Sequence, residues 1–392
     1  MDFLVDIWSY LGPFLLVLTV LVFVHELGHY LMARRNGVRV EIFSIGFGPE
    51  IYGWDDTHGT RWKISWIPLG GYVKFYGDVG VASQPDPEHV AAGTGETEDE
   101  NDGGRLLTPE ETASSYHFKS VGQRSAISVA GPAANFLFAI IMLAGLYAIV
   151  GQPFTPADVG GINPDSPAET AGFQVGDRVI EIDGASIERF EEMQHIVRLS
   201  LGDPMKIVVL RNDAEIVLNA RPKVTEYTDR LGNVQHIGLL GITRSGVEYV
   251  RHGPVSAIVS ATKETITITG MTLTAVGQMI VGARTTDDLG GPIQIAKMSG
   301  QMAEQGIVAI IWFMSVLSIN LGLINLFPVP MLDGGHLLFY FFEAVRGRPL
   351  SERVQEYGFR IGISMILMLM LFATWNDFSK LPVFGFLAKM LS

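Results

Sequence analysis

The chain has 392 residues, of which 48% are hydrophobic and only 18% are charged, and its formal net charge is −13. This length suits two or three domains. The absence of cysteine excludes disulfide bonds, thiolate metal ligands and a cysteine nucleophile. An acidic chain of this kind gives no support to a nucleic-acid partner.

Four apolar blocks dominate the sequence. Residues 7–24, 125–153, 307–332 and 361–374 contain no Asp, Glu, Lys, Arg or His. Crossing the hydrocarbon core of a bilayer takes about 20 helical residues, and the fourth block approaches this length if its flanking aromatic residues lie at the interfaces. The first block follows no basic region and precedes no small-residue cleavage site, so we expect a retained span rather than a cleaved signal peptide.

The first span, predicted over residues 1–35, carries His25, Glu26 and His29 in the stretch "LVFVHELGHYLMARR". Helix positions i and i+4 share one face, so both imidazoles can bind one metal ion, and Glu26 can reach a water bound to it. This is the H-E-x-x-H pattern of zinc peptidases; two histidines that cap a helix or face a loop are the structural alternative. Each ionisable group inside a membrane costs roughly 2.5–3.5 kcal/mol, which favours a functional interpretation.

Residues 36–78 alternate aromatic and β-branched residues with Gly and Pro turn signals, which predicts β-hairpins. Their apolar character favours hairpins associated with the membrane, and a small soluble cytoplasmic sheet is the alternative. Residues 79–115 follow with many acidic, Gly and Pro residues, a composition that predicts a disordered cytoplasmic loop. The second span is predicted over residues 116–152.

Basic residues indicate the orientation of the spans, because basic residues in short flanking loops stay in the cytoplasm. They follow the first span, precede the second, and lie between the third and fourth. All three clusters agree with four spans whose two termini, together with residues 151–306, lie outside the cytoplasm. The clusters are Arg34, Arg35 and Arg39; Lys119 and Arg124; and Arg346, Arg348 and Arg353.

Residues 153–225 resemble a bacterial PDZ domain. The resemblance lies in "GGI", in "SPAETAGFQVGDRVIEIDG" and in a helical pattern near residues 190–201. Such a domain captures an extended peptide by strand addition, here in a groove between that helix and residues 160–163, which include Gly160, Gly161 and Ile162. A small β-rich domain without a ligand is the alternative. Residues 226–306 are predicted to form a connector of β-strands and helices, and they show no second clear copy of the PDZ pattern.

A catalytic zinc usually has three protein ligands and one open position. The favoured third ligand is Asp333 in "NLFPVPMLDGGH", at the same predicted membrane depth as His29, where two prolines break the helix. His336 is a rival, and His58 is the remaining candidate in the hairpin region. The third span and this motif occupy residues 307–345. A cytoplasmic loop, the fourth span and a tail occupy residues 346–392.

These motifs, together with "GFGPEI", "IPLGGYVKFYGD", "GPAANF" and "GGPIQIAKMSG", make the chain resemble the bacterial site-2 proteases of the RseP type, in peptidase family M50. The resemblance implies a polytopic α-helical membrane protein with four transmembrane helices, membrane-associated β-hairpins and an extracytoplasmic PDZ-like α+β domain. It implies Zn²⁺ held by His25, His29 and Asp333, with Glu26 as the catalytic glutamate. Asn325 is expected to orient substrate or stabilise an oxyanion, and bonding a broken helix end is its alternative role.

The implied activity is hydrolysis of peptide bonds within transmembrane segments of single-span proteins, in the bilayer of a bacterial inner membrane. An anti-sigma factor already cut outside the membrane by a site-1-type protease is the expected substrate, and remnant signal peptides are a further one. The hairpin strand with Gly70, Gly71, Tyr72 and Val73 is expected to pair with the unwound substrate. A catalytically silent scaffold that binds peptides through its PDZ domain is the alternative, which the intact motifs disfavour.

Overall fold

The computed structural model describes residues 2–79, 84–85, 107–200, 202–228, 234–246, 248–282 and 290–379. The chain forms two compact units. The first comprises residues 1–143, 261–273 and 287–392, and the second comprises residues 144–260 and 274–286.

Among the described residues, four helices are long and apolar enough to cross a membrane: residues Trp8–Arg35 of α1 (Asp2–Arg35), α4 (Val121–Ile149), α9 (Ile307–Asn325), and residues Arg353–Phe378 of α11 (Glu352–Ser379). The four predicted spans are confirmed, and the chain is a membrane protein. Large apolar side chains on these helices, such as Leu16, Leu137 and Met368, are more than half exposed. An apolar exterior of this extent suits contact with lipid rather than with water.

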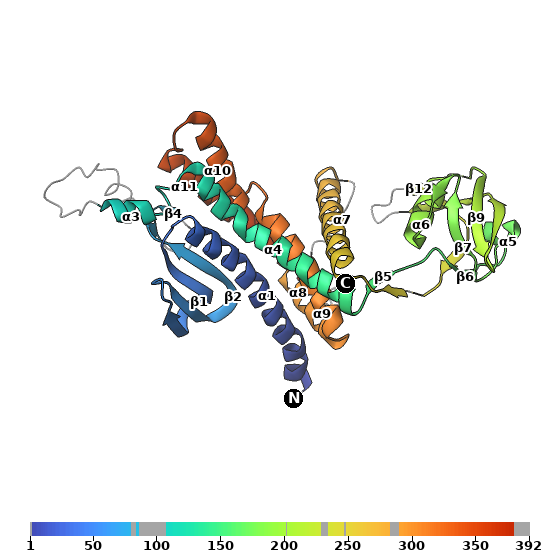
Figure 1. Cartoon of the computed structure of the whole chain (residues 1–392), viewed down its shortest axis with the longest axis horizontal. Helices are drawn as coiled ribbons and strands as arrows, with labels where there is room; N and C mark the ends of the chain where they lie inside the picture. Colours follow the sequence, from blue (N-terminus) through green and yellow to red (C-terminus); the bar gives the residue numbers. More distant parts are fainter. Residues whose placement is uncertain are drawn as a thin grey trace, which may run out of the picture. The chain divides into compact units, whose positions relative to one another are not determined.

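The helices of the first unit pack through apolar contacts and buried hydrogen bonds. Val17 and Leu21 of α1 cluster with Ile310 and Met314 of α9. The hydroxyl of Ser318 in α9 donates to the main-chain oxygen of Asn135 in α4, over 2.9 Å. Figure 1 shows α1, α4 and α9 together with α8 (Pro292–Glu304) and α10 (Asp333–Arg346).

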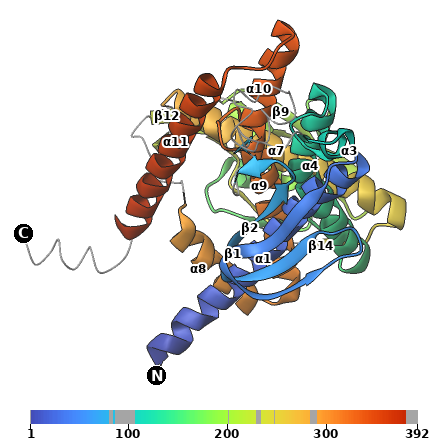
Figure 2. The ribbon, with the colours of Figure 1, turned by 90° about the vertical axis from the view of Figure 1, so that its left-hand side faces the viewer.

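Beside α1 lies a curled sheet of two long strands, β1 (Val40–Asp55) and β2 (Arg61–Phe75), in the hairpin region that the sequence predicts (Figure 2). Residues 42–45 of β1 pair both with residues 61–64 and with residues 71–74 of β2. Both parts of β2 can pair with β1 because β2 bends at Gly70. The φ of Gly70 is +144°, and its missing side chain leaves room for the ring of Phe47. Residues 71–74 therefore form one edge of the sheet.

The turn between β1 and β2 is organised by Asp56. Its carboxylate accepts hydrogen bonds from the main-chain N–H groups of His58 and Thr60, from the hydroxyl of Tyr30 and from the indole N–H of Trp62. Burial alone raises the pKa of a carboxyl, but these four donors hold the pKa of Asp56 well below its usual range. Because Tyr30 belongs to α1, the same carboxylate fastens the turn to the first span.

The predicted acidic loop at residues 79–115 lies largely outside the described residues. In its described parts, β3 (Asp78–Val79) pairs with β4 (Gln84–Pro85), and residues Pro109–Ser114 form the short helix α3. This helix lies within the range predicted as disordered. Its start is fixed locally, because Thr108 and Glu111 form a reciprocal capping box and Pro109 occupies the first helical position.

The second unit is a small β-rich domain. It contains a four-stranded sheet in the order β10-β9-β7-β8 and the strand pairs β13-β6, β14-β5 and β11-β12. Ile182, Ile207 and Val209 from the sheet pack against Phe190 and Met193 of α6 in its core. The bounds are β5 (Gln152–Phe154), β6 (Val159–Ile162), α5 (Pro167–Ala171), β7 (Arg178–Ile182), β8 (Ala185–Ser186), α6 (Phe190–Leu199), β9 (Met205–Arg211), β10 (Ala214–Ala220), β11 (Lys223–Thr228), β12 (Val234–Leu239), β13 (Ile242–Arg244) and β14 (Glu248–Val250). The long helix α7 (Pro254–Ile280) follows in the sequence.

The N-terminus of α8 is held by Asp377, a buried residue near the end of α11. One carboxylate oxygen accepts the N–H of Gly291 over 2.9 Å, and the other accepts the N–H groups of Ile293 and Gln294 over 3.0 and 3.1 Å. The first N–H groups of a helix have no partner within it and carry partial positive charge. A buried carboxylate satisfies both requirements, so α11 and α8 are tied through one side chain.

Replacing this carboxylate tests its contribution. We expect Asp377→Ala to lower the free energy of unfolding in detergent by about 1–3 kcal/mol, because three main-chain N–H groups, one of them buried, lose a charged acceptor. Hydrogen exchange at residues 291–294 should accelerate at the same time. The matched control is Glu356→Ala on the same helix, which removes only an exposed ion pair with Arg360 and should change stability by less than about 0.5 kcal/mol. Equal losses in the two variants would contradict the capping role.

Candidate metal centre

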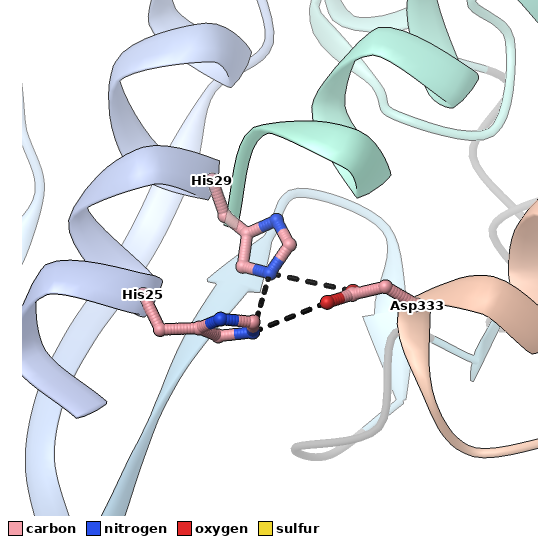
Figure 3. Close-up of side chains that lie close together, drawn as sticks. All are labelled: His25, His29 and Asp333. Atoms are coloured by element: carbon pink, nitrogen blue, oxygen red, sulfur yellow. Dashed lines mark hydrogen bonds and ion pairs between the residues drawn. The ribbon is translucent and has the colours of Figure 1, made fainter. Parts of the chain in front are cut away.

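Three side chains from two distant parts of the sequence converge in the first unit (Figure 3). His25 and His29 lie one turn apart on α1, and their Nε2 atoms are 3.2 Å from each other. The Nε2 atoms of His25 and His29 lie 3.1 and 3.3 Å from the two carboxylate oxygens of Asp333. The ligand atoms of the three residues all lie within 4.8 Å of one another, the arrangement that one bound cation requires.

Asp333 reaches this position because the chain breaks after α9 and folds back. Met331 adopts a left-handed backbone conformation with φ of +85°, Leu332 is extended, and Asp333 is the first residue of α10. A side chain on Gly334 or Gly335 would overlap main-chain atoms of residues 326–330, so the two glycines permit this close fold. The start of α10 also favours the negative charge of Asp333 through the helix dipole.

The donor set fits the predicted zinc ion. Two imidazole nitrogens and one carboxylate are ligands of catalytic zinc sites. Although Nε2 of His25 is 3.1 Å from Oδ2 of Asp333, this buried oxygen has no hydrogen-bond partner among the described residues, because the contact lacks hydrogen-bond geometry. An unsatisfied buried carboxylate oxygen is costly, and a coordinated cation would satisfy it.

The backbone of α4 fixes the tautomer of one ligand. Nδ1 of His29 lies 2.8 Å from the carbonyl oxygen of Ile127, so Nδ1 carries the hydrogen and Nε2 keeps its lone pair for a metal. Nδ1 of His25 lies 3.1 Å from the side-chain amide nitrogen of Asn135, also in α4. One face of α4 therefore contacts the Nδ1 atoms of both imidazoles.

Glu26 lies between the two histidines in sequence and contacts the edge of the curled sheet. Glu26 and Val73 of β2 line the same cavity. A Cβ on Gly71 would lie 3.4 Å from Cγ of Glu26, so β2 runs directly against α1 at this residue. The edge strand and the predicted catalytic glutamate are thus neighbours.

A cavity of about 480 Å³ joins these groups. Its walls include the three candidate ligands, Glu26, Asn325 at the end of α9, and the strand segment Gly70, Gly71, Tyr72 and Val73. Tyr116 also lines the cavity, and its hydroxyl shares a 2.7 Å hydrogen bond with that of Tyr340. Burial, reinforced by Tyr340, raises the pKa of Tyr116, which is therefore neutral at pH 7.

The two rival candidate ligands, His336 and His58, lie outside the cluster of three residues. His336, on the next turn of α10, lines the same cavity, but its ring packs near those of Tyr340 and Phe359, with centroids 6.3 and 5.5 Å away. His58 lies exposed in the turn between β1 and β2. Neither belongs to the cluster of His25, His29 and Asp333.

Comparison with known proteins fits this geometry. The profile of Peptidase family M50 matches residues 13–369. The chain belongs to peptidase family M50. The membership predicted from the sequence motifs is therefore confirmed.

Full-length relatives of this M50 peptidase have similar lengths. A protein of Agrobacterium fabrum, whose name assigns it provisionally to the zinc metalloproteases, is 44% identical over 95% of this chain and 96% of its own. Metalloprotease MmpA of Caulobacter vibrioides is 37% identical over 96% of this chain and 97% of its own. Among solved structures, the PDZ domain of an SdrC-like protein from Listeria monocytogenes is 26% identical, with a TM-score of 0.18, over 23% of this chain and 88% of that domain.

The cavity of the second unit shares the helical wall and Asn163 with the predicted peptide groove, and the rest of its lining differs. A cavity of about 150 Å³ runs along α6, lined by Phe190, Met193 and Val197. Its other wall is Asn163 and residues Gly238–Ile242. Gly160, Gly161 and Ile162 belong to β6, which pairs with β13.

Three supporting groups of the M50 peptidase had no role predicted from sequence: the carbonyl of Ile127, Gly131 and Asn135, spaced four residues apart on α4. A Cβ on Gly131 would overlap the ring of His29 and lie 2.9 Å from Cε1 of His25. The motif "GPAANF" contains two of these residues. It contributes to the family resemblance, but small and amide residues in an apolar helix give no separate sign of metal chemistry.

A single methyl group on α4 should disrupt the centre. We expect Gly131→Ala to displace the imidazoles and weaken zinc binding at least about tenfold, the scale of damage to ligand orientation. The measurement is zinc affinity by chelator competition in detergent. Gly145→Ala on the same helix is the control, since a Cβ there has no neighbour within 4 Å. Unchanged affinity in Gly131→Ala would show that α4 does not form the wall of the site.

Proposed function

We propose that this M50 peptidase is an intramembrane zinc metalloprotease that hydrolyses peptide bonds within transmembrane segments of single-span proteins. The observation that carries the proposal is the cluster of His25, His29 and Asp333, which lies among apolar helices and lines a cavity with Glu26. In a bilayer such a group of ionisable residues is expected to be functional.

The chemistry divides between the metal and the chain. Zinc, when bound by His25, His29 and Asp333, acts as a Lewis acid that polarises a carbonyl and lowers the pKa of water. Glu26 accepts a proton from the attacking water and returns it to the leaving amine, so one peptide bond is broken and one water is consumed. Asn325, on the cavity wall, orients the substrate or stabilises the oxyanion; its alternative role is to bond the end of α9.

The substrate must unwind before cleavage, because a helix hides its carbonyls in hydrogen bonds. The segment Gly70, Gly71, Tyr72 and Val73 offers a place for the unwound strand. It lies at an edge of the curled sheet and lines the cavity beside Glu26. An extended peptide added to such an edge gains main-chain hydrogen bonds with little dependence on its sequence.

The proposed setting is a bacterial inner membrane, with both termini and the second unit outside the cytoplasm. The basic clusters beside the spans support this orientation. Association of the β1–β2 sheet with the bilayer is supported by Ile51, Tyr52, Trp66 and Leu69, which are more than half exposed. The division of the chain predicted from sequence is part of the same proposal.

The proposed substrates are an anti-sigma factor already cut by a site-1-type protease outside the membrane, and remnant signal peptides. In this scheme the second unit recognises the trimmed substrate in the manner of a PDZ domain. The cavity along α6 supports the idea. Gly160, Gly161 and Ile162 stay in the proposal as the strand predicted to bind peptide.

Removing the charge of Glu26 should separate binding from catalysis. We expect Glu26→Gln to retain zinc and to lower the cleavage rate of a model single-span substrate by at least about 100-fold, the scale of general acid–base catalysis. Rates are measured with purified protein in detergent, and zinc by elemental analysis. Glu356→Gln, on the exposed face of α11, is the control and should cleave normally. Undiminished cleavage by Glu26→Gln would remove the catalytic assignment.

The ligand set is tested in the same preparation. His25→Ala, His29→Ala and Asp333→Ala should each lose most of the bound zinc, whereas His336→Ala should keep it. Zinc retained after loss of Asp333, together with zinc lost after loss of His336, would exchange the roles of these two residues.

The orientation of the chain is directly measurable because it contains no cysteine. We expect Glu215→Cys, on an exposed strand of the second unit, to react with a membrane-impermeant maleimide in intact spheroplasts. Ser351→Cys, between α10 and α11, should react only after the membrane is opened. The reverse pattern would invert the proposed topology.

A further inference from the structure

Asn135 is fully buried in α4, and its side-chain amide lies beside a metal ligand. Nδ2 of the amide is 3.1 Å from Nδ1 of His25. The amide oxygen Oδ1 is buried and has no hydrogen-bond partner among the described residues. Leaving a buried oxygen unpaired in an apolar helix is unfavourable. The amide therefore needs a reason beyond packing.

Metal binding requires a particular tautomer of His25. A neutral imidazole carries one hydrogen, on either Nδ1 or Nε2. Since the Nε2 atoms of His25 and His29 converge on Asp333, a cation at this point takes the lone pairs of both Nε2 atoms. Each Nδ1 must then carry the hydrogen. His29 donates this hydrogen to the carbonyl of Ile127, and His25 needs an equivalent acceptor.

We propose that Asn135 is a positioning residue of the metal site: its amide turns by half a rotation, so that Oδ1 accepts the Nδ1–H of His25. This inference rests on the proposed zinc function. The rotation breaks no hydrogen bond of Oδ1, since that oxygen has none, and it exchanges two groups of similar size. A donor facing a donor is replaced by an acceptor facing a donor.

The two orientations of the amide serve the two tautomers of His25. With Nδ2 toward Nδ1, the amide donates, and the imidazole hydrogen lies on Nε2, on the side of Asp333. With Oδ1 toward Nδ1, the amide accepts, and Nε2 is free to bind a metal. An asparagine side chain offers both a donor and an acceptor, whereas aspartate offers only acceptors and leucine offers neither.

The surroundings hold Asn135 in register for this task. Its main-chain oxygen accepts the hydroxyl of Ser318 over 2.9 Å, which ties α4 to α9 at the same level. Ile127, Gly131 and Asn135 follow each other at four-residue intervals, so they lie along one face of the helix. This face supplies an acceptor for His29, space for its ring and an acceptor for His25.

The first test compares zinc affinity in the full-length protein in detergent, by chelator competition. Asn135→Leu, which has a similar size but no acceptor, should bind zinc about 10–100-fold more weakly than the wild type. Asn135→Asp, which keeps an acceptor, should stay within a few-fold of the wild type. Ser318→Ala, which removes the neighbouring hydroxyl without touching His25, should also stay within a few-fold.

The results separate the two proposals. If the wild type binds no zinc, both the proposed function and this inference fail. If the wild type and Asn135→Leu bind zinc equally, only the role of Asn135 fails. Equal weakening in Asn135→Asp and Asn135→Leu overturns it as well, because acceptance of a hydrogen bond would not be the property that matters.

The second test uses only the wild-type protein, so it does not depend on the folding of a variant. In wild-type protein labelled with ¹⁵N-histidine and loaded with ¹¹³Cd, coupling between cadmium and nitrogen identifies the two bound rings. We expect both rings to be coordinated through Nε2 and to carry hydrogen on Nδ1. Removing the metal should shift one of these rings, that of His25, toward the Nε2–H tautomer, while Ile127 holds the other. Coordination through Nδ1, or a His25 tautomer that ignores the metal, overturns the proposal.

Discussion

The arrangement of the first unit depends on one constraint: ionisable side chains within an apolar helix must have partners. His25, Glu26 and His29 lie inside the first span, where water is scarce and each unpaired polar group is costly. The neighbouring elements supply these partners. The first residue of α10 supplies a carboxylate, α4 supplies a carbonyl and an amide, and Gly71 of β2 lies against Glu26. The irregular backbone around Asp333 is the structural consequence.

Close approach of backbones makes this convergence possible. Gly131 admits the imidazoles against α4, and Gly334 and Gly335 let the start of α10 fold onto the segment that precedes it. Small residues play this part between membrane helices because lipid offers no hydrophobic driving force for association, so tight packing and polar contacts hold the helices together. The same glycines that permit packing therefore determine the distance between the ligands.

The helical spacing of His25 and His29 and the aspartate after a broken span could be predicted from sequence, because both follow from local rules. A shared site for the three residues was also predicted, and the structure adds the distances between their side chains. The support from Ile127 and Asn135 was not predictable, since a carbonyl leaves no mark in a sequence and an amide in "GPAANF" has many possible uses. The same limit explains α3 and the groove along α6. The helix α3 starts at a local capping box, in a range whose overall composition predicted disorder. In the second unit, residues 238–242 lie far along the chain from residue 163 and supply part of the wall of the groove.

Contact between Glu26 and the edge of β2 has a consequence for how binding and chemistry are coupled. The side chain that the mechanism needs as a base lies against Gly71, in the strand segment proposed to pair with the substrate. A peptide that pairs with this edge therefore lies next to the base, and any movement of the strand also changes the contact between β2 and that base. Substrate position and proton acceptance are linked through the contact of Gly71 with Glu26.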